Sequence, residues 1–143
     1  MLRNSMVLCL LSVAVTTLAQ SLPLLNPSFE EGNGQPAHWS LSAGKGAWEN
    51  QGQTGRRGVS VTGTGQDSSQ WKSDVFPLAP GETYRFTYWA RTDPGAQSGC
   101  ITSGTDAVNR DYQAGSEWEK KTFIFKNPNN VSDGVVHLGQ WYK

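Results

Sequence analysis

The sequence predicts an all-β fold in which short strands form a β-sandwich. Three observations support this prediction. Segments of alternating apolar and polar residues recur along the chain, and turns rich in Gly or Pro separate them at intervals of roughly 8–12 residues. No amphipathic helix longer than a turn is visible after the N-terminal leader. The 16 glycines and 6 tryptophans among 143 residues suit tight turns and an aromatic core.

The first 19 residues have the features of a secretory signal peptide. Arg3 precedes a mostly apolar run over 6–15, and small residues at 17–19 provide a cleavage site. This run is shorter than the roughly 20 apolar residues that a membrane-spanning helix needs. We therefore expect a cleaved leader over 1–19, a secreted or extracellular protein, and one domain over 20–143.

The charge of the chain is balanced. Twelve basic and twelve acidic residues give a formal charge of zero, and the only basic clusters are the pairs Arg56–Arg57 and Lys120–Lys121. A nucleic-acid-binding protein needs a basic face that releases counterions, so we expect no nucleic-acid partner, and we expect no membrane partner either. Neutral ligands suit this composition better than polyanions.

Strands are expected in order along the mature chain, starting with a short strand or lead-in at 22–25. Gly44 and Gly46 divide the next segment into two pieces around a bend, and Pro80–Gly81 is a turn signal. The later expected strands are 39–48 in two pieces, 59–62, 70–76, 84–91, short strands near 100–102 and 110–113, 118–125 and 135–142.

The clearest strand is 84–91, where residues alternate strictly. Tyr84, Phe86 and Tyr88 lie on one face, and Trp89 lies on the other, with basic and hydroxyl neighbours. If the tyrosine face is the core, Trp89 is presented on a surface with the composition of a binding cleft. The alternative is that loops or the curvature of the sandwich also cover this second face.

A series of motifs, which follow one another in a set order along the chain, resembles that of a known family. The series is Asn26-Pro-Ser-Phe-Glu-Glu-Gly32, Trp39, Gly58-Val-Ser-Val61, Trp71-Lys-Ser73, Leu78-Ala-Pro-Gly-Glu-Thr-Tyr84, Tyr88-Trp-Ala-Arg91, Trp118 and the pair Phe123 and Phe125. It resembles the carbohydrate-binding modules with the galactose-binding-like jelly-roll fold, which are found beside bacterial xylanases and cellulases. The resemblance implies non-catalytic binding of a polysaccharide or oligosaccharide, with further domains in a longer parent protein.

The resemblance also implies a structural calcium ion. Modules of this kind end with a further strand that carries an acidic pair, and that strand helps to hold calcium beside the opening motif. This sequence stops before it, so we expect a truncated jelly roll that lacks its last strand. Glu30 matches the position of a calcium-binding carboxylate, and backbone carbonyls at 55–58 could join it. Calcium takes six to eight oxygens, so the site is expected to be incomplete in this chain.

Sugar recognition needs flat aromatic faces against the C–H groups of the ring, and polar side chains that pair with its hydroxyls. We expect Trp39 and Trp118 to be core residues, because large aromatic rings dominate the burial energy of small domains. The remaining aromatic side chains and their polar neighbours supply the candidate ligand-binding residues, which are Trp48, Trp71, Trp89, Arg91, Tyr112 and Gln140.

Catalysis has little support in the sequence. No Gly-x-Ser-x-Gly elbow and no His-Glu-x-x-His motif is present, and His38 and His137 are isolated. A glycosidase also needs two carboxylates at a set separation, and none can be paired from sequence. We therefore expect no enzyme. The alternative to a sugar-binding module is a structural or docking jelly roll without a glycan ligand, and exposed aromatic residues would favour the former.

Overall fold

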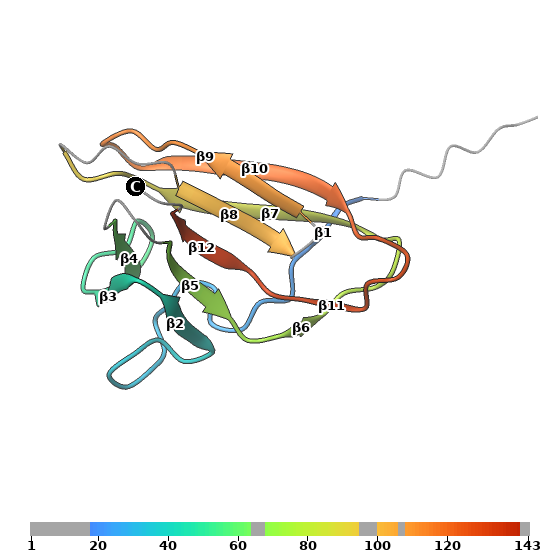
Figure 1. Cartoon of the computed structure of the whole chain (residues 1–143), viewed down its shortest axis with the longest axis horizontal. Helices are drawn as coiled ribbons and strands as arrows, with labels where there is room; N and C mark the ends of the chain where they lie inside the picture. The colour runs from blue at the N-terminus through green and yellow to red at the C-terminus, as the bar shows by residue number, and fades with distance from the viewer. Residues whose placement is uncertain (1–17, 64–67, 95–99, 106–107, 141–143) are drawn as a thin grey trace, which may run out of the picture.

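The computed structural model of the protein describes residues 18–63, 68–94, 100–105 and 108–140 (Figure 1). Within these ranges the chain forms twelve β-strands and no helix, which confirms the predicted all-β class. Most of the predicted signal peptide, residues 1–17, lies outside the described ranges, as do residues 141–143. The described part contains no helix that is long and apolar enough to cross a membrane.

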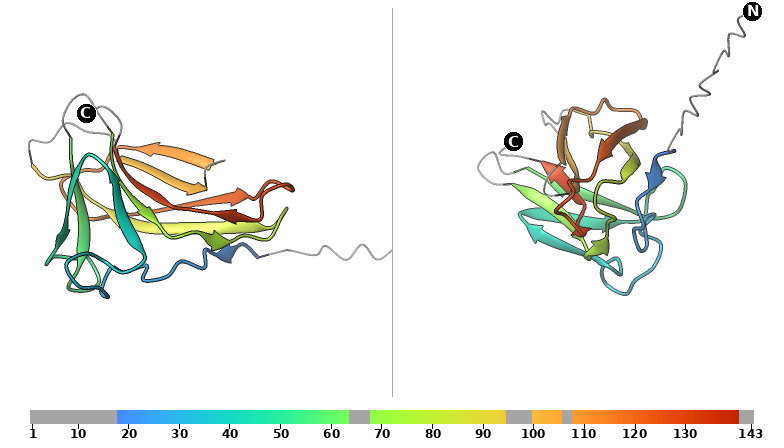
Figure 2. Two further views of the ribbon diagram at one scale, coloured as in Figure 1. Left: turned by 60° about the horizontal axis from the view of Figure 1, so that its bottom comes forward. Right: turned by 90° about the vertical axis from the view of Figure 1, so that its right-hand side faces the viewer.

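The first sheet contains the two longest strands of the fold, β7 (Thr83–Ala90) and β10 (Glu119–Lys126), which pair antiparallel along their whole length. The short strand β1 (Gln20–Ser21) runs parallel to the start of β7, so the order is β1-β7-β10. Figures 1 and 2 show β7 and β10 side by side along the molecule.

Alternation decides which face of these two strands meets the core. Tyr84 and Phe86 of β7 are buried, and so is Phe125 of β10. The residues between them point to the opposite, outer face, where Trp89 and Ile124 are exposed. The tyrosine face of this strand is therefore the core face, which meets the condition under which Trp89 was expected on the opposite surface.

The second large sheet has the order β2-β5-β12-β8-β9, with every neighbouring pair antiparallel. In chain order its strands are β2 (Trp39–Ala43), β5 (Ser69–Ser73), β8 (Cys100–Thr105), β9 (Val108–Tyr112) and β12 (His137–Gln140). The ring of Tyr112 in β9 lies 6.3 Å from that of Tyr88 in β7, centroid to centroid. The two sheets thus meet through side chains, an arrangement consistent with a β-sandwich.

Two pairs of shorter strands complete the described fold. They are β3 (Lys45–Glu49) with β4 (Gly58–Thr62), and β6 (Phe76–Pro77) with β11 (Asp133–Gly134). The bend predicted between β2 and β3 is present at Gly44, which has a φ of +69°. A Cβ atom at this position would also collide with Ser69, so the turn requires glycine.

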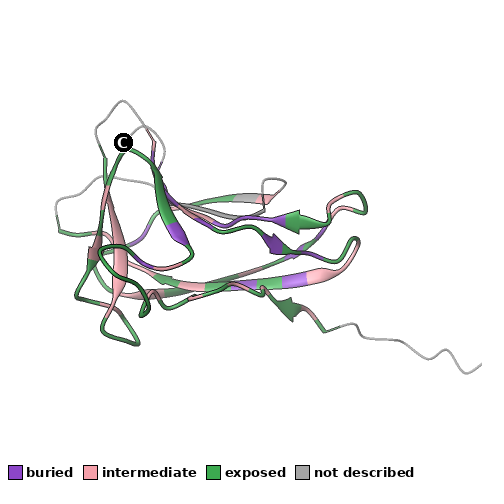
Figure 3. Cartoon of the chain, turned by 90° about the horizontal axis from the view of Figure 1, so that it is seen from below, coloured by how far each residue is buried: buried purple, intermediate pink, exposed green. Residues whose placement is uncertain are grey.

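The core lies where the two large sheets face each other. Its buried side chains are Trp39, Trp71, Phe76, Leu78, Tyr84, Phe86, Phe125 and Val136. In contrast, every residue of the β3–β4 pair is half-buried or exposed, and these strands are pink and green in Figure 3. The core is therefore dense between the large sheets and thinner toward this pair.

Some strand predictions need correction. Of the two alternatives for 22–25, a strand or a lead-in, the structure has the lead-in, because the pairing with β7 occurs just before it, at Gln20–Ser21. The single strand expected over 70–76 is two, because Asp74 leaves the sheet and its backbone N–H donates to the carbonyl oxygen of His38 at 2.8 Å. The described part of the last strand begins at His137 rather than at 135.

Candidate functional site

Trp89 is the most distinctive side chain of the outer face. It is 39% exposed, and its alternation with Phe86 and Tyr88 turns its ring away from the core. Among the described residues, its side chain makes no hydrogen bond, no ring contact and no cation contact. Burying a large aromatic ring is strongly favourable, so a tryptophan left open on a rigid strand is a candidate binding group.

The other described tryptophans all have partners. The indole N–H groups of Trp39, Trp48 and Trp71 donate to the carbonyl oxygens of Asn26, Phe29 and Ser60 at 3.1, 2.8 and 2.9 Å respectively. Trp118 is half-buried, and the guanidinium carbon of Arg91 lies 5.2 Å from its ring centroid. Within the described ranges, Trp89 is therefore the tryptophan that remains free to meet a ligand.

A groove of about 590 Å³ crosses the outer face of the β7–β10 pair. Thr87 and Thr122 form its floor, and their Oγ1 atoms lie 2.9 Å apart. Leu22, Leu24 and Pro27 of the N-terminal segment line it as well. The groove thus combines hydroxyl groups on a rigid sheet with apolar side chains, a composition typical of small-ligand sites.

Trp89 lies beside one end of this groove, although it is not one of the residues that line it. It is in register with Lys120, which lines the groove, and side chains directly opposite each other on an antiparallel pair are close neighbours. Arg85 lines the groove four residues earlier on β7. From the sequence, Trp89 was expected on a face with basic and hydroxyl neighbours. Lys120 was not among the candidates, although the alternation of Lys120, Thr122 and Ile124 could have revealed it.

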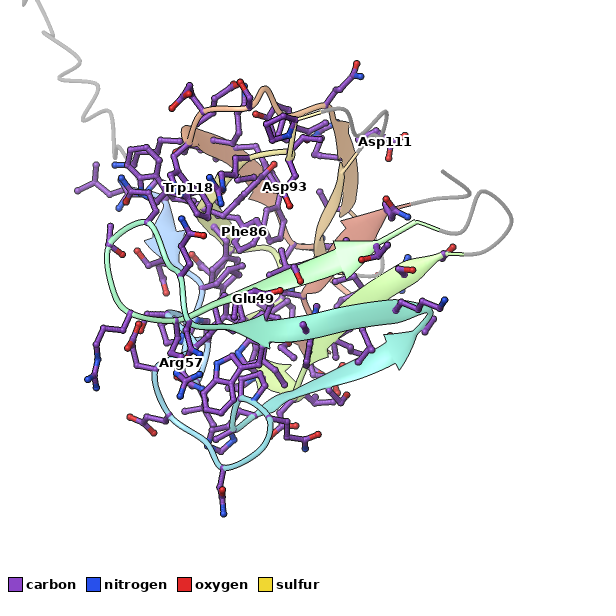
Figure 4. All side chains as sticks on the ribbon, turned by 90° about the vertical axis from the view of Figure 1, so that its left-hand side faces the viewer. Glu49, Arg57, Phe86, Asp93, Asp111 and Trp118 are labelled. Atoms are coloured by element: carbon purple, nitrogen blue, oxygen red, sulfur yellow. The ribbon has the colours of Figure 1, made fainter. Side chains whose placement is uncertain are left out.

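Arg91 and Trp48 are both occupied by contacts within the protein. Arg91 donates from Nη2 to Oε1 of Gln51 at 3.1 Å in addition to covering Trp118. The guanidinium of Arg57 covers the ring of Trp48 at 4.2 Å. Figure 4 looks at this end of the molecule and labels both Trp118 and Arg57. These arginine–tryptophan pairs are cation–π contacts that cover the thinner end of the core.

Trp71 and Gln140 lie inside the fold. Trp71 is 4% exposed, and Gln140 at the end of β12 is 3% exposed. The polar neighbours that suggested an exposed Trp71 are Gln70 and Lys72, which alternate with it on β5 and point the other way. Because a buried ring has no open face for a sugar, we leave Trp71 and Gln140 out of the proposed binding surface.

Tyr112 belongs to a polar network at the edge of the inner face. Its hydroxyl donates to Oε2 of Glu119 at 2.9 Å, and Nζ of Lys121 lies 2.8 Å from the same oxygen. Lys121 lowers the pKa of Glu119 to about 2, helped by the backbone N–H of Gly115 and by Tyr112. Burial raises the pKa of Tyr112. The network ties β9 to β10, which gives Tyr112 a structural role in this arrangement.

The opening motif forms a closed loop around Asn26. This residue has a φ of +46°, and its Nδ2 donates to the carbonyl oxygens of Glu31 and Ala37, each at 2.9 Å. Its Oδ1 accepts from the backbone N–H of Glu31 at 3.1 Å. The asparagine therefore ties both sides of the loop together through local side-chain to backbone bonds.

Glu30 lies against the loop that the resemblance assigned to calcium binding. Its Oε1 accepts from the backbone N–H of Arg57 at 2.9 Å, and a Cβ on Gly55 would collide with this carboxylate. The described residues contain no group of three or more His, Cys, Asp or Glu side chains that could hold a metal ion. Calcium also binds backbone carbonyl oxygens, so the calcium site at Glu30 stays a prediction.

A second cavity, of about 240 Å³, brings together Ser73, His38 and Asp74. Nδ1 of His38 lies 2.9 Å from Oδ2 of Asp74. The hydroxyl of Ser73, however, donates to the carbonyl oxygen of Asp74 and accepts from the backbone N–H of Val136, both at 2.9 Å. Because the Ser73 hydroxyl is hydrogen-bonded to two backbone groups, it makes no hydrogen bond to His38. The three side chains therefore lack the serine–histidine bond that activates a nucleophile.

Comparison with known proteins gives no family. A scan against models of protein families finds no match, and a search of curated protein sequences finds none.

Proposed function

We propose that this protein binds polysaccharides or oligosaccharides without modifying them, as an accessory module of a secreted protein. The observation that carries the proposal is the free side chain of Trp89. It lies on the outer face of β7, 39% exposed and without a partner among the described residues, at the end of a groove with a hydroxyl-lined floor.

The chemistry of a sugar ring suits this arrangement. One face of a pyranose carries C–H groups that pack against an aromatic ring, whose electron-rich face attracts them. The hydroxyl groups at the rim can exchange hydrogen bonds with Thr87 and Thr122. Both strands that present these side chains belong to a continuous antiparallel pair, so the surface is formed before the ligand arrives, which lowers the entropic cost of binding.

Calorimetric titration with a panel of soluble neutral and acidic polysaccharides tests the proposal. We expect saturable binding of at least one of them and at least about a tenfold loss of affinity in Trp89→Ala. Trp89→Phe should retain part of the affinity, because a smaller aromatic face remains. Val75→Ala removes an exposed apolar side chain at the other cavity and should bind like the parent protein.

Two results would contradict the proposal. A folded protein that binds no member of the panel would favour the structural or docking module. Binding that survives in Trp89→Ala would place the sugar site elsewhere on the molecule.

Calcium binding is a separate proposal, with Glu30 as the candidate carboxylate. Calcium should raise the unfolding temperature by mass action if it binds the folded state, and Glu30→Gln should reduce that shift. An unfolding temperature that is equal with calcium and with a chelator would contradict it.

A further inference from the structure

The groove beside Trp89 contains two cations that have no acidic partner. Arg85 and Lys120 line it, and neither side chain makes a salt bridge or hydrogen bond within the described part of the chain. Lys126 also points outward on β10, and the outward positions of β7 and β10 carry no Asp or Glu. This face is therefore locally basic, although the formal charge of the whole chain is zero.

Adjacent lysines on β10 show the difference between the two faces. Lys121 points to the inner side, where its Nζ lies 2.8 Å from Oε2 of Glu119. Lys120 points to the outer side because side chains alternate along a strand, and no carboxylate of the described ranges pairs with it there. A positive charge that the protein leaves unpaired within a groove is available to an anionic ligand.

The charges are arranged along the groove rather than gathered at one point. Lys120 lies opposite Trp89 at one end. Arg85 is four residues from Trp89 along β7, a distance of roughly 13 Å between Cα atoms. Thr87 and Thr122 lie between these ends. A ligand that meets both cations and the indole must be extended and must carry more than one negative charge, or charges that repeat along it.

We propose that the ligand of this groove is an acidic polysaccharide, recognised through the carboxylate groups of its uronate residues. This inference rests on the proposed sugar-binding function and deepens it by naming the ligand class. Arg85 can pair with a carboxylate through two parallel hydrogen bonds, and Lys120 supplies a point charge beside the stacking surface of Trp89. The carboxylate on the sugar ring thus takes the place of the acidic partner that is absent among the described residues.

A uronate polymer fits better than a nucleic acid. Nucleic-acid affinity comes from neutralising many closely spaced phosphates with a broad basic face. The groove supplies two unpaired cations, in a chain whose formal charge is zero. Carboxylates spaced by whole sugar rings require fewer cations, and the threonine hydroxyls between the cations suit the neutral part of each ring.

Matched ligands test this proposal directly. Glucuronoxylan, polygalacturonate and alginate should each be titrated beside the same polymer after chemical reduction of its carboxyl groups, which keeps the sugar chain and removes the charge. We expect at least one acidic polymer to bind about tenfold more tightly than its reduced form. Added salt should weaken the binding of the acidic form more than that of the reduced form.

Variants of the two groove cations test whether the preference for acidic polymers arises in the groove. In the double variant Arg85→Gln with Lys120→Gln, the preference for the acidic form should fall to within about twofold. Lys126→Gln removes an exposed cation from the same face but outside the groove lining, so it should keep the preference. Thermal unfolding of each variant verifies that the exchange leaves the fold intact.

The outcomes separate the two proposals. Equal affinity for acidic and reduced polymers, with loss of both in Trp89→Ala, would overturn the uronate inference and leave the sugar-binding proposal standing. Absence of binding to every polymer would overturn both. Tighter binding of a single-stranded oligonucleotide than of any acidic polysaccharide would also overturn the uronate inference.

Discussion

The two faces of the β7–β10 pair contain similar residue types in different surroundings. On the inner face, Tyr84, Phe86 and Phe125 are each at most 6% exposed, whereas Trp89 on the outer face is 39% exposed. The difference arises because a second sheet covers the inner face, and the N-terminal segment covers only part of the outer one. An aromatic residue therefore contributes to stability or remains available for a ligand according to what covers it.

The inner face is aromatic along most of its length and polar at one end. Phe86 and Phe123 lie 5.5 Å apart between ring centroids, and Tyr88 and Tyr112 continue the row at 6.3 Å. Beyond them the row ends in the polar network of Glu119. The aromatic row provides burial, and the network ties the edges of the two sheets together.

The largest difference in stability between the two faces is expected when an aromatic ring at the centre of the inner face is truncated. Phe86→Ala should lower the free energy of unfolding by about 3–5 kcal/mol, because it removes a buried ring and leaves a cavity. Thr87→Ala, its neighbour on the outer face, should change it by only about 1 kcal/mol or less, since it loses a cross-strand pair with Thr122 but no buried ring. Urea denaturation measures both, with Phe86→Leu as a milder variant if Phe86→Ala does not fold. Equal losses at the two positions would contradict the assignment of the faces.

A smaller loss is expected when only the polar end of an inner ring is removed. The hydroxyl of Tyr84 accepts a hydrogen bond from the backbone N–H of Ala79 at 2.8 Å. Tyr84→Phe keeps the buried ring but leaves this donor without its acceptor, so the free energy of unfolding should fall by about 0.5–1.5 kcal/mol. An unchanged denaturation midpoint would mean that water replaces the hydroxyl.

The Glu119 network predicts a pH dependence on the inner side. The pKa of the Glu119 carboxyl group is lowered from 4.5 to about 2 in the folded state. The contribution of Glu119 to stability is therefore present above pH 4.5 and is lost as the pH falls toward 2. The unfolding temperatures of the parent protein and Glu119→Gln should therefore converge over this range. Glu117→Gln removes an exposed carboxylate without a described partner and is the control. A constant difference between the parent and Glu119→Gln would contradict the prediction.

The smallest effect of replacing an aromatic residue is expected at the outer face, where Trp89→Ala should change the free energy of unfolding by about 1 kcal/mol or less. No hydrogen bond, ring contact or cation contact of this side chain is described, and it lies outside the buried core, so its removal opens no core cavity. Together with a loss of glycan affinity, that result would separate binding from folding on the two sides of one strand. A loss of about 2 kcal/mol or more would mean that Trp89 is a packing residue, in favour of the structural module.

The alternation over 84–91 could be interpreted correctly from sequence because a strand has a fixed period of two. The same rule, applied to 69–73, would have placed Trp71 in the core, since Ser69, Trp71 and Ser73 are buried and the residues between them are half-exposed. Polar neighbours on a strand describe its opposite face, which is why they were misleading at Trp71. Two-residue strands such as β6 and β11 have no local signal at all.

The groove could not be predicted, because it forms between segments about sixty residues apart. Leu22 and Leu24 resemble an ordinary lead-in, and only the parallel pairing of β1 with β7 brings them beside Arg85. The partners of Trp48 and Arg91 were hidden as well, because the conformation of the loop at 50–57 decides where Arg57 and Gln51 lie.

The sequence by itself determined the all-β class, the bend at Gly44 and the face on which Trp89 lies, since these follow from backbone conformation and from the period of a strand. Only the tertiary structure decided which tryptophans are covered, where the groove lies and which cations lack a partner. These properties depend on the neighbours that distant segments supply, and local periodicity carries no information about them.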